Sequence, residues 1–259
     1  MYNNSANTKF TGKSILFLPS CHSTNSIALD KIRSGEATNG LIVITDEQTS
    51  GRGQRGNVWL SKPGANLTLS IIYLPEVFPV QDGFYLNMVA SLAVSETLQT
   101  LLPQKSVSVK WPNDVYCGVK KLSGILIENA IRGNYISSSI IGIGINVNEN
   151  ITQLPNAGSL YQEINHILNL QDIFTILIEN IERYYLLLMS GQKTELFKQY
   201  TQQLFRLNQQ CMYKDAEGEF TGTIKGITAD GKLVMQRNSG ETLFYNFKEV
   251  EYIHEHTLP

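Results

Sequence analysis

The feature that most constrains this chain is a segment rich in glycine and arginine at residues 51–56, with the sequence GRGQRG. Glycine has no Cβ, so its backbone can adopt positive φ and can approach a ligand closely. Arginine adds a planar, permanent cation whose geometry suits carboxylates and phosphates. The segment therefore predicts a loop that closes over an anionic ligand.

The same six residues match the G-x-G-x-x-G pattern of dinucleotide-binding folds. That fingerprint requires a helix to begin at the motif, because the helix N-terminus holds the pyrophosphate. Here the chain continues through Pro63 and Gly64 instead. It then enters a stretch in which Leu67, Leu69 and Ile71 alternate as in a strand. We therefore expect no helix after the motif and exclude a dinucleotide-binding fold.

Composition and charge exclude several classes of protein. The 259 residues, 42% of them apolar and 17% charged, can form one large domain, alone or with a small one. The net charge of −2 gives no basic field for nucleic acid. No apolar run approaches the ~18–20 residues that span a bilayer, and residues 1–13 lack the apolar core of a signal peptide. Three widely spaced cysteines without a C-x-x-C pair indicate a reducing cytoplasm.

Hydrophobic periodicity predicts an α+β fold. Short apolar runs predict strands at residues 15–18, 41–44, 67–74 and 107–109, and hairpins predict further strands within residues 114–145. Helical spacing predicts one helix after Ser23, a long helix that ends before Pro103, and two more helices between residues 173 and 207. From residue 209 onward, short strands and turns predict a small β-barrel. We therefore expect two domains, residues 1–208 and 209–259, the first with a mixed, largely antiparallel sheet flanked by helices.

Several polar clusters lie where a predicted strand or helix begins or ends. Pro112 must break the strand before it, which displays Asn113 and Asp114 at a strand end, where ligand-binding groups commonly lie. Asn-Asp after proline is also ordinary turn chemistry. Residues 23–25, with the sequence STN, suit both a helix N-cap and a ligand contact, and the two uses are compatible.

Five motifs now stand in one order along the chain: STN at 23–25, GRGQRG at 51–56, KWPND at 110–114, KLSGILIE at 121–128 and GIGINVN at 142–148. Together they closely resemble the motifs of biotin–protein ligases, the enzymes that attach biotin to carboxylase carrier domains. The resemblance covers roughly residues 20–150, and the tail is similar only in position and strand content. It implies a catalytic domain similar to class II synthetases, followed by a small C-terminal β-barrel.

The resemblance implies a two-step reaction in the cytoplasm. Biotin carboxylate attacks the α-phosphate of ATP to give biotinyl-5′-adenylate and pyrophosphate, and a carrier lysine then displaces AMP to form an amide. The implied substrates are biotin and ATP, with Mg²⁺ entering with ATP rather than at a dedicated protein site. The implied partner is an apo biotin carboxyl carrier domain, and we expect a monomer or weak homodimer that binds neither DNA nor membrane.

The residues suit this chemistry without reference to the family. A carboxylate that approaches a polyphosphate meets repulsion of about 4 kcal/mol for each pair of unit charges at ~4 Å and an effective dielectric near 20. One such uncompensated interaction slows the step roughly a thousandfold. Arg52, Arg55 and Lys121 can supply compensating charge, and amides of the glycine-rich segment can supply neutral donors.

Residue roles are carried over by motif position. The resemblance implies biotin contacts from Ser23, Thr24, Asn25, Gln48, Arg52, Gly53, Gln54, Lys121 and Gly124. It implies nucleotide contacts from Arg52, Arg55, Trp59, Asn113, Lys121 and Asn146, with Mg²⁺ near Asn113. Arg52 and Lys121 are the expected catalytic residues. The plain alternatives are surface salt-bridging for Lys121 and core packing for Trp59.

This chain differs from many members of the family in two respects. It has Gln54 where they carry a second arginine, which removes a charge and bears on how firmly the adenylate is held and on whether Arg55 compensates. Some bacterial relatives carry a DNA-binding winged helix before the ligase domain. Only 22 residues precede Ser23, so we expect a ligase without operator binding.

Residues 48–60 are expected to be mobile when empty and to become ordered over the adenylate. Their glycine content and lack of apolar anchors motivate this expectation, because ordering costs about 1–2 kcal/mol per residue and ligand contacts must offset it. Two other functions stay open: a lipoate–protein ligase, and a non-catalytic sensor of biotin or its adenylate. His254 and His256 in the tail are interpreted as a solvated end rather than a metal site.

Overall fold

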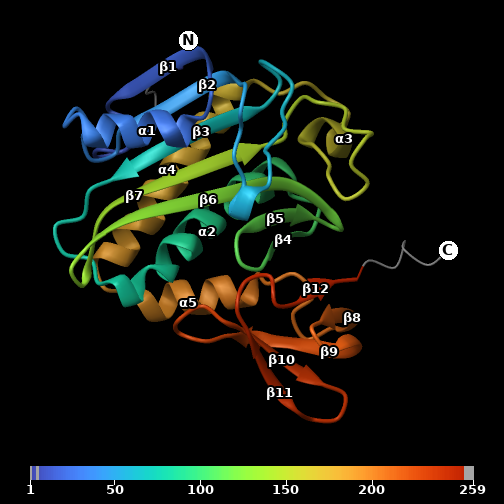
Figure 1. The fold of residues 1–259 in the computed structure, drawn as a ribbon. Coiled ribbons are helices and arrows are strands. Elements are labelled where there is room, and N and C mark those ends of the chain that lie inside the picture. Colours follow the sequence, from blue (N-terminus) through green and yellow to red (C-terminus); the bar gives the residue numbers. More distant parts are fainter. Residues whose placement is uncertain (1, 4–5, 254–259) are drawn as a thin grey trace.

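The computed structural model describes residues 2–3 and 6–253, with only the backbone of Arg55. His254 and His256 lie outside the described residues. Two sheets dominate the fold, a large one built by residues 15–145 and a small one near the C-terminus (Figure 1).

The large sheet has seven strands in the order β1-β2-β3-β7-β6-β5-β4. Their bounds are β1 Ile15–Cys21, β2 Ile42–Gln48, β3 Leu67–Tyr73, β4 Val107–Lys110, β5 Asp114–Cys117, β6 Lys120–Arg132 and β7 Tyr135–Ile145. β1 and β2 run parallel, and the other neighbouring strands run antiparallel. The expected mixed, largely antiparallel sheet is confirmed.

Helices cover both faces of this sheet (Figure 1). Their bounds are α1 Thr24–Arg33, α2 Phe84–Leu101, α3 Leu160–Ile164, α4 Leu170–Met189 and α5 Lys193–Gln202, with short 3-10 helices η1 Gln54–Gly56 and η2 Val80–Asp82. The five-residue α3 is too short for a helical pattern to reveal it in the sequence. The chain after the GRGQRG segment enters β3 without an α-helix, as expected.

Strand β3 explains how the two faces differ. Its side chains are all buried because both faces are covered. Ile71 and Tyr73 point into the large core formed with α2 and α4, whereas Ile72 packs with α1 on the other face, as expected for the two-residue repeat of a strand. Thr68 and Ser70 therefore share the α1 face, where they are buried polar groups.

The C-terminal sheet has five antiparallel strands in the order β11-β10-β9-β8-β12. Their bounds are β8 Gln210–Asp215, β9 Gly218–Ile227, β10 Leu233–Arg237, β11 Thr242–Tyr245 and β12 Glu251–Tyr252. Buried side chains of this sheet, among them Tyr213 and Met235, belong to the same continuous cluster as those of α2 and α4. The division of the chain after residue 208 therefore stays a prediction.

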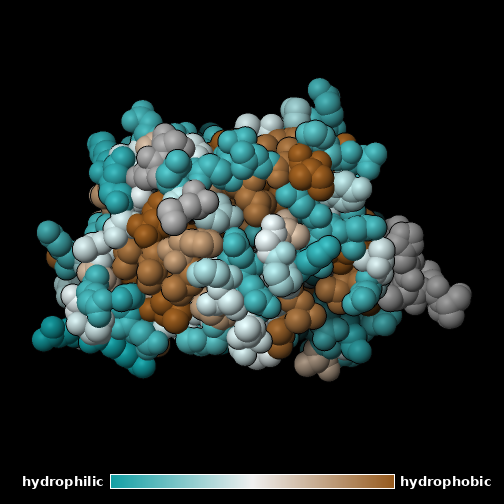
Figure 2. Space-filling model, turned by 90° about the horizontal axis from the view of Figure 1, so that it is seen from above, coloured by the Kyte–Doolittle hydropathy of each residue, from teal (hydrophilic) through white to brown (hydrophobic). Residues whose placement is uncertain are grey.

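The surface carries both hydrophilic and hydrophobic side chains. Figure 2 shows one face from above, where hydrophobic side chains gather in a few patches between hydrophilic ones. Within residues 2–3 and 6–253, no helix combines the length and apolar character needed to cross a bilayer. The three cysteines are free thiols, in agreement with the absence of a disulfide frame expected from their spacing.

Candidate active site

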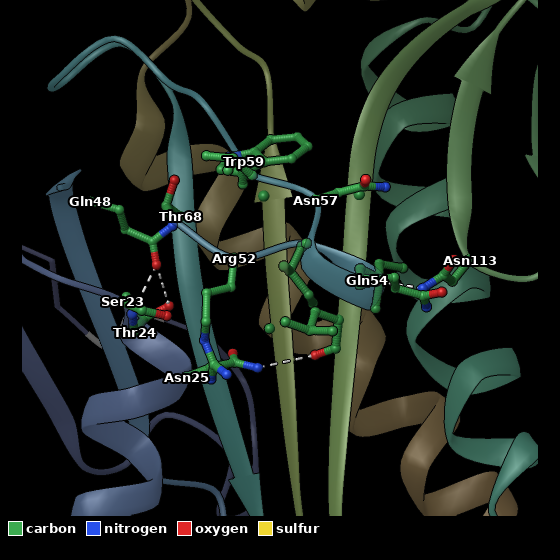
Figure 3. A pocket seen from close by; sticks show the side chains of 18 of the residues that line it. Ser23, Thr24, Asn25, Gln48, Arg52, Gln54, Asn57, Trp59, Thr68 and Asn113 are labelled. Carbon is green, nitrogen blue, oxygen red and sulfur yellow. Dashed lines mark hydrogen bonds between the residues drawn. The ribbon is translucent and has the colours of Figure 1, made fainter. Parts of the chain in front are cut away.

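A cavity lies on the α1 face of the large sheet, between the start of α1, β3, β6, β7 and the glycine-rich loop, here defined as residues 51–59 (Figure 3). It brings together most of the residues that the sequence singled out: Ser23, Thr24, Asn25, Gln48, Arg52, Gly53, Gln54, Trp59, Asn113, Lys121 and Gly124. All five motifs, which are far apart in the sequence, therefore contribute to one cavity. The fifth contributes to its floor through β7.

Three glycines on β6 and β7 form the floor of the cavity. Gly124 and Gly144 are register partners, and Gly142 lies two residues away on the same face. A Cβ at Gly144 would lie 2.3 Å from Cε2 of Trp59, and a Cβ at Gly142 would lie 2.2 Å from Oδ1 of Asn25. Glycine is required at these positions because side chains above the sheet approach its backbone closely.

One end of the cavity is lined by hydroxyl and amide groups. The backbone N–H of Thr24 donates to Oε1 of Gln48 at 2.8 Å. The Ser70 hydroxyl lies 2.7 Å from Oγ1 of Thr24 and 2.6 Å from Oδ1 of Asn25. Ser23 occupies the N-cap position of α1, but its side chain makes no capping hydrogen bond. This end is a buried polar surface suited to a neutral, hydrogen-bonding ligand group.

Gln48 is the last residue of β2, and this strand is longer than the sequence predicts. The sequence predicts an apolar strand at residues 41–44 followed by a polar connector, whereas β2 continues to Gln48. The register pairs Ser20 with Glu47 and Cys21 with Gln48, so β1 supports the polar half of β2. The polar side chains of this extension concealed it, and those of residues 46–48 are only partly buried.

The glycine-rich loop folds as a small hairpin beside the cavity (Figure 3). Arg52 and Val58 form an antiparallel bridge, and the N–H of Gly53 donates to the carbonyl of Asn57 at 2.6 Å. The turn between them is η1 Gln54–Gly56. The loop thus has internal hydrogen bonds of its own, and its expected ordering on ligand binding stays a prediction.

Trp59 anchors this loop to the cavity floor. Its indole contacts the backbone of Gly124 and Gly144, and Nζ of Lys121 lies 5.9 Å from the ring centroid. The expectation that the loop lacks an apolar anchor is therefore wrong, because the glycines leave room for a large ring. The buried Nε1 of Trp59 has no hydrogen-bond partner among the described residues, which leaves a donor for a ligand.

The two cations of the cavity each contact a carboxylate. Nζ of Lys121 lies 2.7 Å from Oδ1 of Asp114, and both side chains are partly exposed. Nη1 and Nη2 of Arg52 donate to the two carboxylate oxygens of Glu128 at 3.1 and 2.8 Å. Lys121 does form a salt bridge, as its alternative interpretation held, but with a residue that itself lines the cavity.

The KWPND motif divides between the cavity and the C-terminal sheet. Asn113 and Asp114 line the cavity. Trp111 faces away from it, where Nε1 donates to the carbonyl of Gly231 at 2.9 Å and the ring packs edge-on against Phe247 at a centroid distance of 6.1 Å. Phe247 in turn lines the cavity, so this motif joins the C-terminal sheet to the site.

Lys110, the first residue of the same motif, is enclosed by aromatic rings. Its Nζ lies 4.8 Å from the ring centroid of Tyr252 and 5.3 Å from that of Tyr116. Burial lowers the pKa of Lys110 below its ordinary value, and the Asp114 carboxylate opposes the shift. Asp114 therefore lies within the fields of two lysines, Lys110 behind it and Lys121 in the cavity.

Among the predicted site residues whose side chains the structure describes, Asn146 is the one that does not line the cavity. Asn146 is buried, and its Nδ2 donates to the carbonyl of Gly158 at 3.0 Å. The N–H of Gly158 donates to the carbonyl of Lys121, so Asn146 supports the backbone behind this lysine. Arg55 lies in η1, and its side chain is outside the described structure. The nucleotide-binding role of both residues stays a prediction.

The structure adds residues that the sequence did not assign to the site. Thr68, Asn57, Asp114 and Phe247 line the cavity, and Glu128 binds Arg52 at its edge. Asp114 was visible as a polar group at a strand end, and the alternation of β3 places Thr68 opposite the apolar core. No sequence signal pointed to Phe247, since its contact depends on how the C-terminal sheet packs.

Comparison with known proteins decides the family. The matching family model is the Biotin/lipoate A/B protein ligase family, over residues 17–146. These residues are half of the chain and include every cavity segment except that of Phe247. The chain belongs to this family. It is therefore a ligase, and its fold is that of the family's solved members.

Similar proteins match between half and nearly all of this chain. Bifunctional ligase/repressor BirA of Bacillus subtilis is 28% identical over 244 residues, which are 92% of this chain and 74% of BirA. The biotin–[acetyl-CoA-carboxylase] ligase of Mycobacterium tuberculosis is 34% identical over 141 residues, 53% of this chain and 51% of the relative. The biotin protein ligase from Aquifex aeolicus, solved with biotin and ATP, gives a TM-score of 0.76 at 25% identity and covers 93% of this chain and 100% of its own.

Proposed function

We propose that this chain is an ATP-dependent biotin–protein ligase that forms biotinyl-5′-AMP and transfers the biotinyl group to a specific lysine of a biotin carboxyl carrier domain. The observation that carries the proposal is the single cavity, in which a buried polar end and the cations Arg52 and Lys121 lie together. A reaction between two anions needs this combination, because one ligand must be oriented while repulsion is offset. The names of the similar ligases support the same function.

The polar end suits the ureido ring of biotin. A ureido group offers two N–H donors and one carbonyl acceptor, and Ser23, Thr24, Asn25 and Gln48 supply both kinds of partner. Ser70 fixes the side chains of Thr24 and Asn25, so these two residues lose little rotamer freedom when the ring binds. Asn25 can take this position because Gly142 has no side chain beneath it.

The first step joins biotin to AMP. A carboxylate oxygen of biotin forms a bond to the α-phosphorus of ATP, and the bond from that phosphorus to the bridging oxygen breaks as pyrophosphate leaves. Arg52 and the amides of Gly53 and Gln54 would hold the carboxylate, and Lys121 would stabilise the charge on the acyl-phosphate oxygens. The chemistry needs no covalent nucleophile of the protein.

The second step transfers the biotinyl group. The neutral amine of the carrier lysine attacks the acyl carbon, an amide bond forms, and the bond to the phosphate oxygen breaks to release AMP and a proton. Lys121 would again neutralise the leaving phosphate. We propose that the carrier enters at the cavity edge beside the glycine-rich loop. We also propose that the ligase works in the cytoplasm as a monomer or weak homodimer.

ATP would occupy the part of the cavity near Asn113 and Trp59. Stacking on the indole and the unpaired Nε1 donor of Trp59 suit adenine. Mg²⁺ usually binds through one or two protein oxygens together with substrate phosphates, and Asn113 and Asp114 place such oxygens in the cavity wall. Mg²⁺ would neutralise the leaving pyrophosphate. Arg55 is proposed as a further phosphate contact.

A labelling assay tests the proposal. The purified chain is incubated with biotin, MgATP and an apo biotin carboxyl carrier domain, and biotin on the carrier is detected by mass spectrometry. We expect one biotinyl group per carrier. A carrier with its target lysine replaced by arginine is the matched control and stays unlabelled. Absence of label on the intact carrier contradicts ligase activity and favours the sensor function.

A second substrate separates biotin from lipoate, which the family description also includes. Exchange of labelled pyrophosphate into ATP requires adenylation of the acid alone, so it reports the first step without a carrier. We expect exchange with biotin and none with lipoate. The reverse result would assign the chain to lipoate ligation.

A further inference from the structure

Glu128 lies at the edge of the cavity, where none of the roles described so far uses it. It follows Gly124 and Leu126 on β6 at intervals of two residues, and both of these line the cavity. The alternation of a strand therefore places its carboxylate on the cavity face of the sheet. Its side chain remains 37% exposed, so it can exchange partners with solvent or ligand.

The carboxylate of Glu128 contacts both the polar end of the cavity and the glycine-rich loop. Oε2 of Glu128 accepts from Nδ2 of Asn25 at 2.7 Å. The same carboxylate accepts a two-point contact from Arg52, with Nη1 to Oε1 at 3.1 Å and Nη2 to Oε2 at 2.8 Å. In Figure 3 the side chain of Arg52 points toward Asn25. Residues 25, 52 and 128 thus form one chain of contacts across three elements.

We propose that Glu128 is a positioning residue that fixes the glycine-rich loop over the cavity and couples the loop to the polar end through Asn25. The coupling rests on the proposed function, whereas the anchoring of the loop does not. By holding the guanidinium of Arg52, the carboxylate sets where the following amides of Gly53 and Gln54 lie. These are the donors proposed to hold the ligand carboxylate.

The geometry favours an anchor over a chance surface pair. The hydrogen bonds within the loop fix its shape, but they do not fix its place on the sheet. Two side chains of the loop do so, Trp59 on the floor and Arg52 on Glu128. A two-point Arg–carboxylate contact fixes orientation as well as distance. Asn25 is itself held by Ser70, so the carboxylate is fixed from the α1 side.

Proteolysis without ligand tests the anchor directly. Trypsin needs an extended backbone at the bond that it cuts, so we expect cleavage after Arg55 to report the opening of η1. The product ending at residue 55 is identified by mass spectrometry. Gln at position 128 can still accept from Asn25, but it loses the charged two-point contact. We expect Glu128→Gln to speed this cleavage roughly fivefold, the upper range for a partly exposed ion pair. Arg52→Lys, which also removes the two-point contact, is expected to do the same.

The chain offers a matched control in Glu96→Gln. Glu96 also pairs with an arginine, Arg183, and the two side chains are exposed to a similar degree as those of Glu128 and Arg52. This pair joins α2 to α4, away from the cavity. We expect cleavage after Arg55 at the wild-type rate in the control. Equal rates for Glu128→Gln and wild type, or an equal increase in the control, would overturn the proposed anchor.

Ligand dependence tests the coupling to Asn25. We expect biotin alone to slow cleavage after Arg55 in the wild type, and to slow it less in Glu128→Gln. In the labelling assay the variant should raise KM for biotin roughly fivefold while kcat changes less than about twofold. A lower kcat at unchanged KM would contradict a positioning role. If the wild type binds no biotin, the proposed function fails, while the ligand-free cleavage still decides the anchor.

Discussion

At the scale of single residues, the cavity holds positive charge that is already compensated. Among the described side chains that line it, Lys121 lies against Asp114 and Arg52 against Glu128. Both pairs are partly exposed, so each contributes little to stability by itself. When negative charge develops at the α-phosphate, Lys121 would stabilise it. This cation is already in place, so no reorganisation is needed during the reaction.

Lys121→Ala should reduce the rate of adenylate formation by a factor of roughly 10²–10³, the loss seen when one preorganised charge-stabilising group is removed. Pyrophosphate exchange with biotin measures this step. Lys120→Ala is the matched control, since Nζ of Lys120 donates to the carbonyl of Pro155 and the residue does not line the cavity. Exchange by Lys121→Ala as fast as wild type would refute the assignment of Lys121.

At the scale of elements, the turn between β4 and β5 contacts the cavity on one side and the C-terminal part of the chain on the other. Asn113 and Asp114 face the cavity, while Trp111 binds the turn that contains Gly231. The hydroxyl of Tyr200 in α5 donates to the carbonyl of Pro112 at 2.6 Å, which fixes the middle of the turn. The C-terminal sheet is thereby held in contact with the element that shapes the site.

Trp111→Phe should lower the free energy of unfolding by about 1–3 kcal/mol, because it leaves the buried carbonyl of Gly231 without its donor. Urea unfolding followed by circular dichroism measures the change. The smaller ring also loses packing against Phe247. Unfolding curves that coincide with those of the wild type would show that this contact does not hold the C-terminal sheet in place.

At the scale of the whole molecule, a carboxylate on α4 binds the N-terminal segment. Glu182 is buried and accepts the backbone N–H groups of Phe10 at 2.9 Å and Thr11 at 2.7 Å, and also that of Lys9. Burial alone would raise the pKa of Glu182, but these hydrogen bonds outweigh it and hold the pKa below the ordinary value of 4.5. The segment before β1 is thus fixed to the helical layer.

This depressed pKa predicts a loss of stability in acid. The carboxylate contributes its full stabilisation above the unfolded pKa, about 4.5, and loses it as pH falls through the lower folded value. Glu182→Gln should therefore be less stable than wild type by about 1–3 kcal/mol near neutral pH, and the difference should shrink in acid. Urea unfolding at several pH values measures it. Glu179→Gln is the control, because exposed Glu179 accepts one backbone N–H, that of Asn7, within the part of the chain that the structure describes. A constant difference between Glu182→Gln and wild type would contradict the pKa shift.

The spacing of residues by itself determined the layers of the fold and the groups offered to a ligand. Alternation of apolar residues predicted β3, hairpin turns predicted β7, and helical spacing predicted α2 and α4. Glycine with proline located the loop and the strand end at Asn113. These features could be predicted because they depend on neighbours a few residues apart. The order of the motifs identified the family, although the short α3 and the polar end of β2 had no such local signal.

Only the tertiary structure decided which side chains meet. Glu128 is 76 residues from Arg52 in the sequence, and Phe247 comes from the loop between β11 and β12. Asn146, expected in the cavity, turns to Gly158 instead. Such pairings follow from strand register and from how the layers pack, which a local pattern does not specify. The sequence determined the chemical groups of the site, and the packing of the sheet determined their partners.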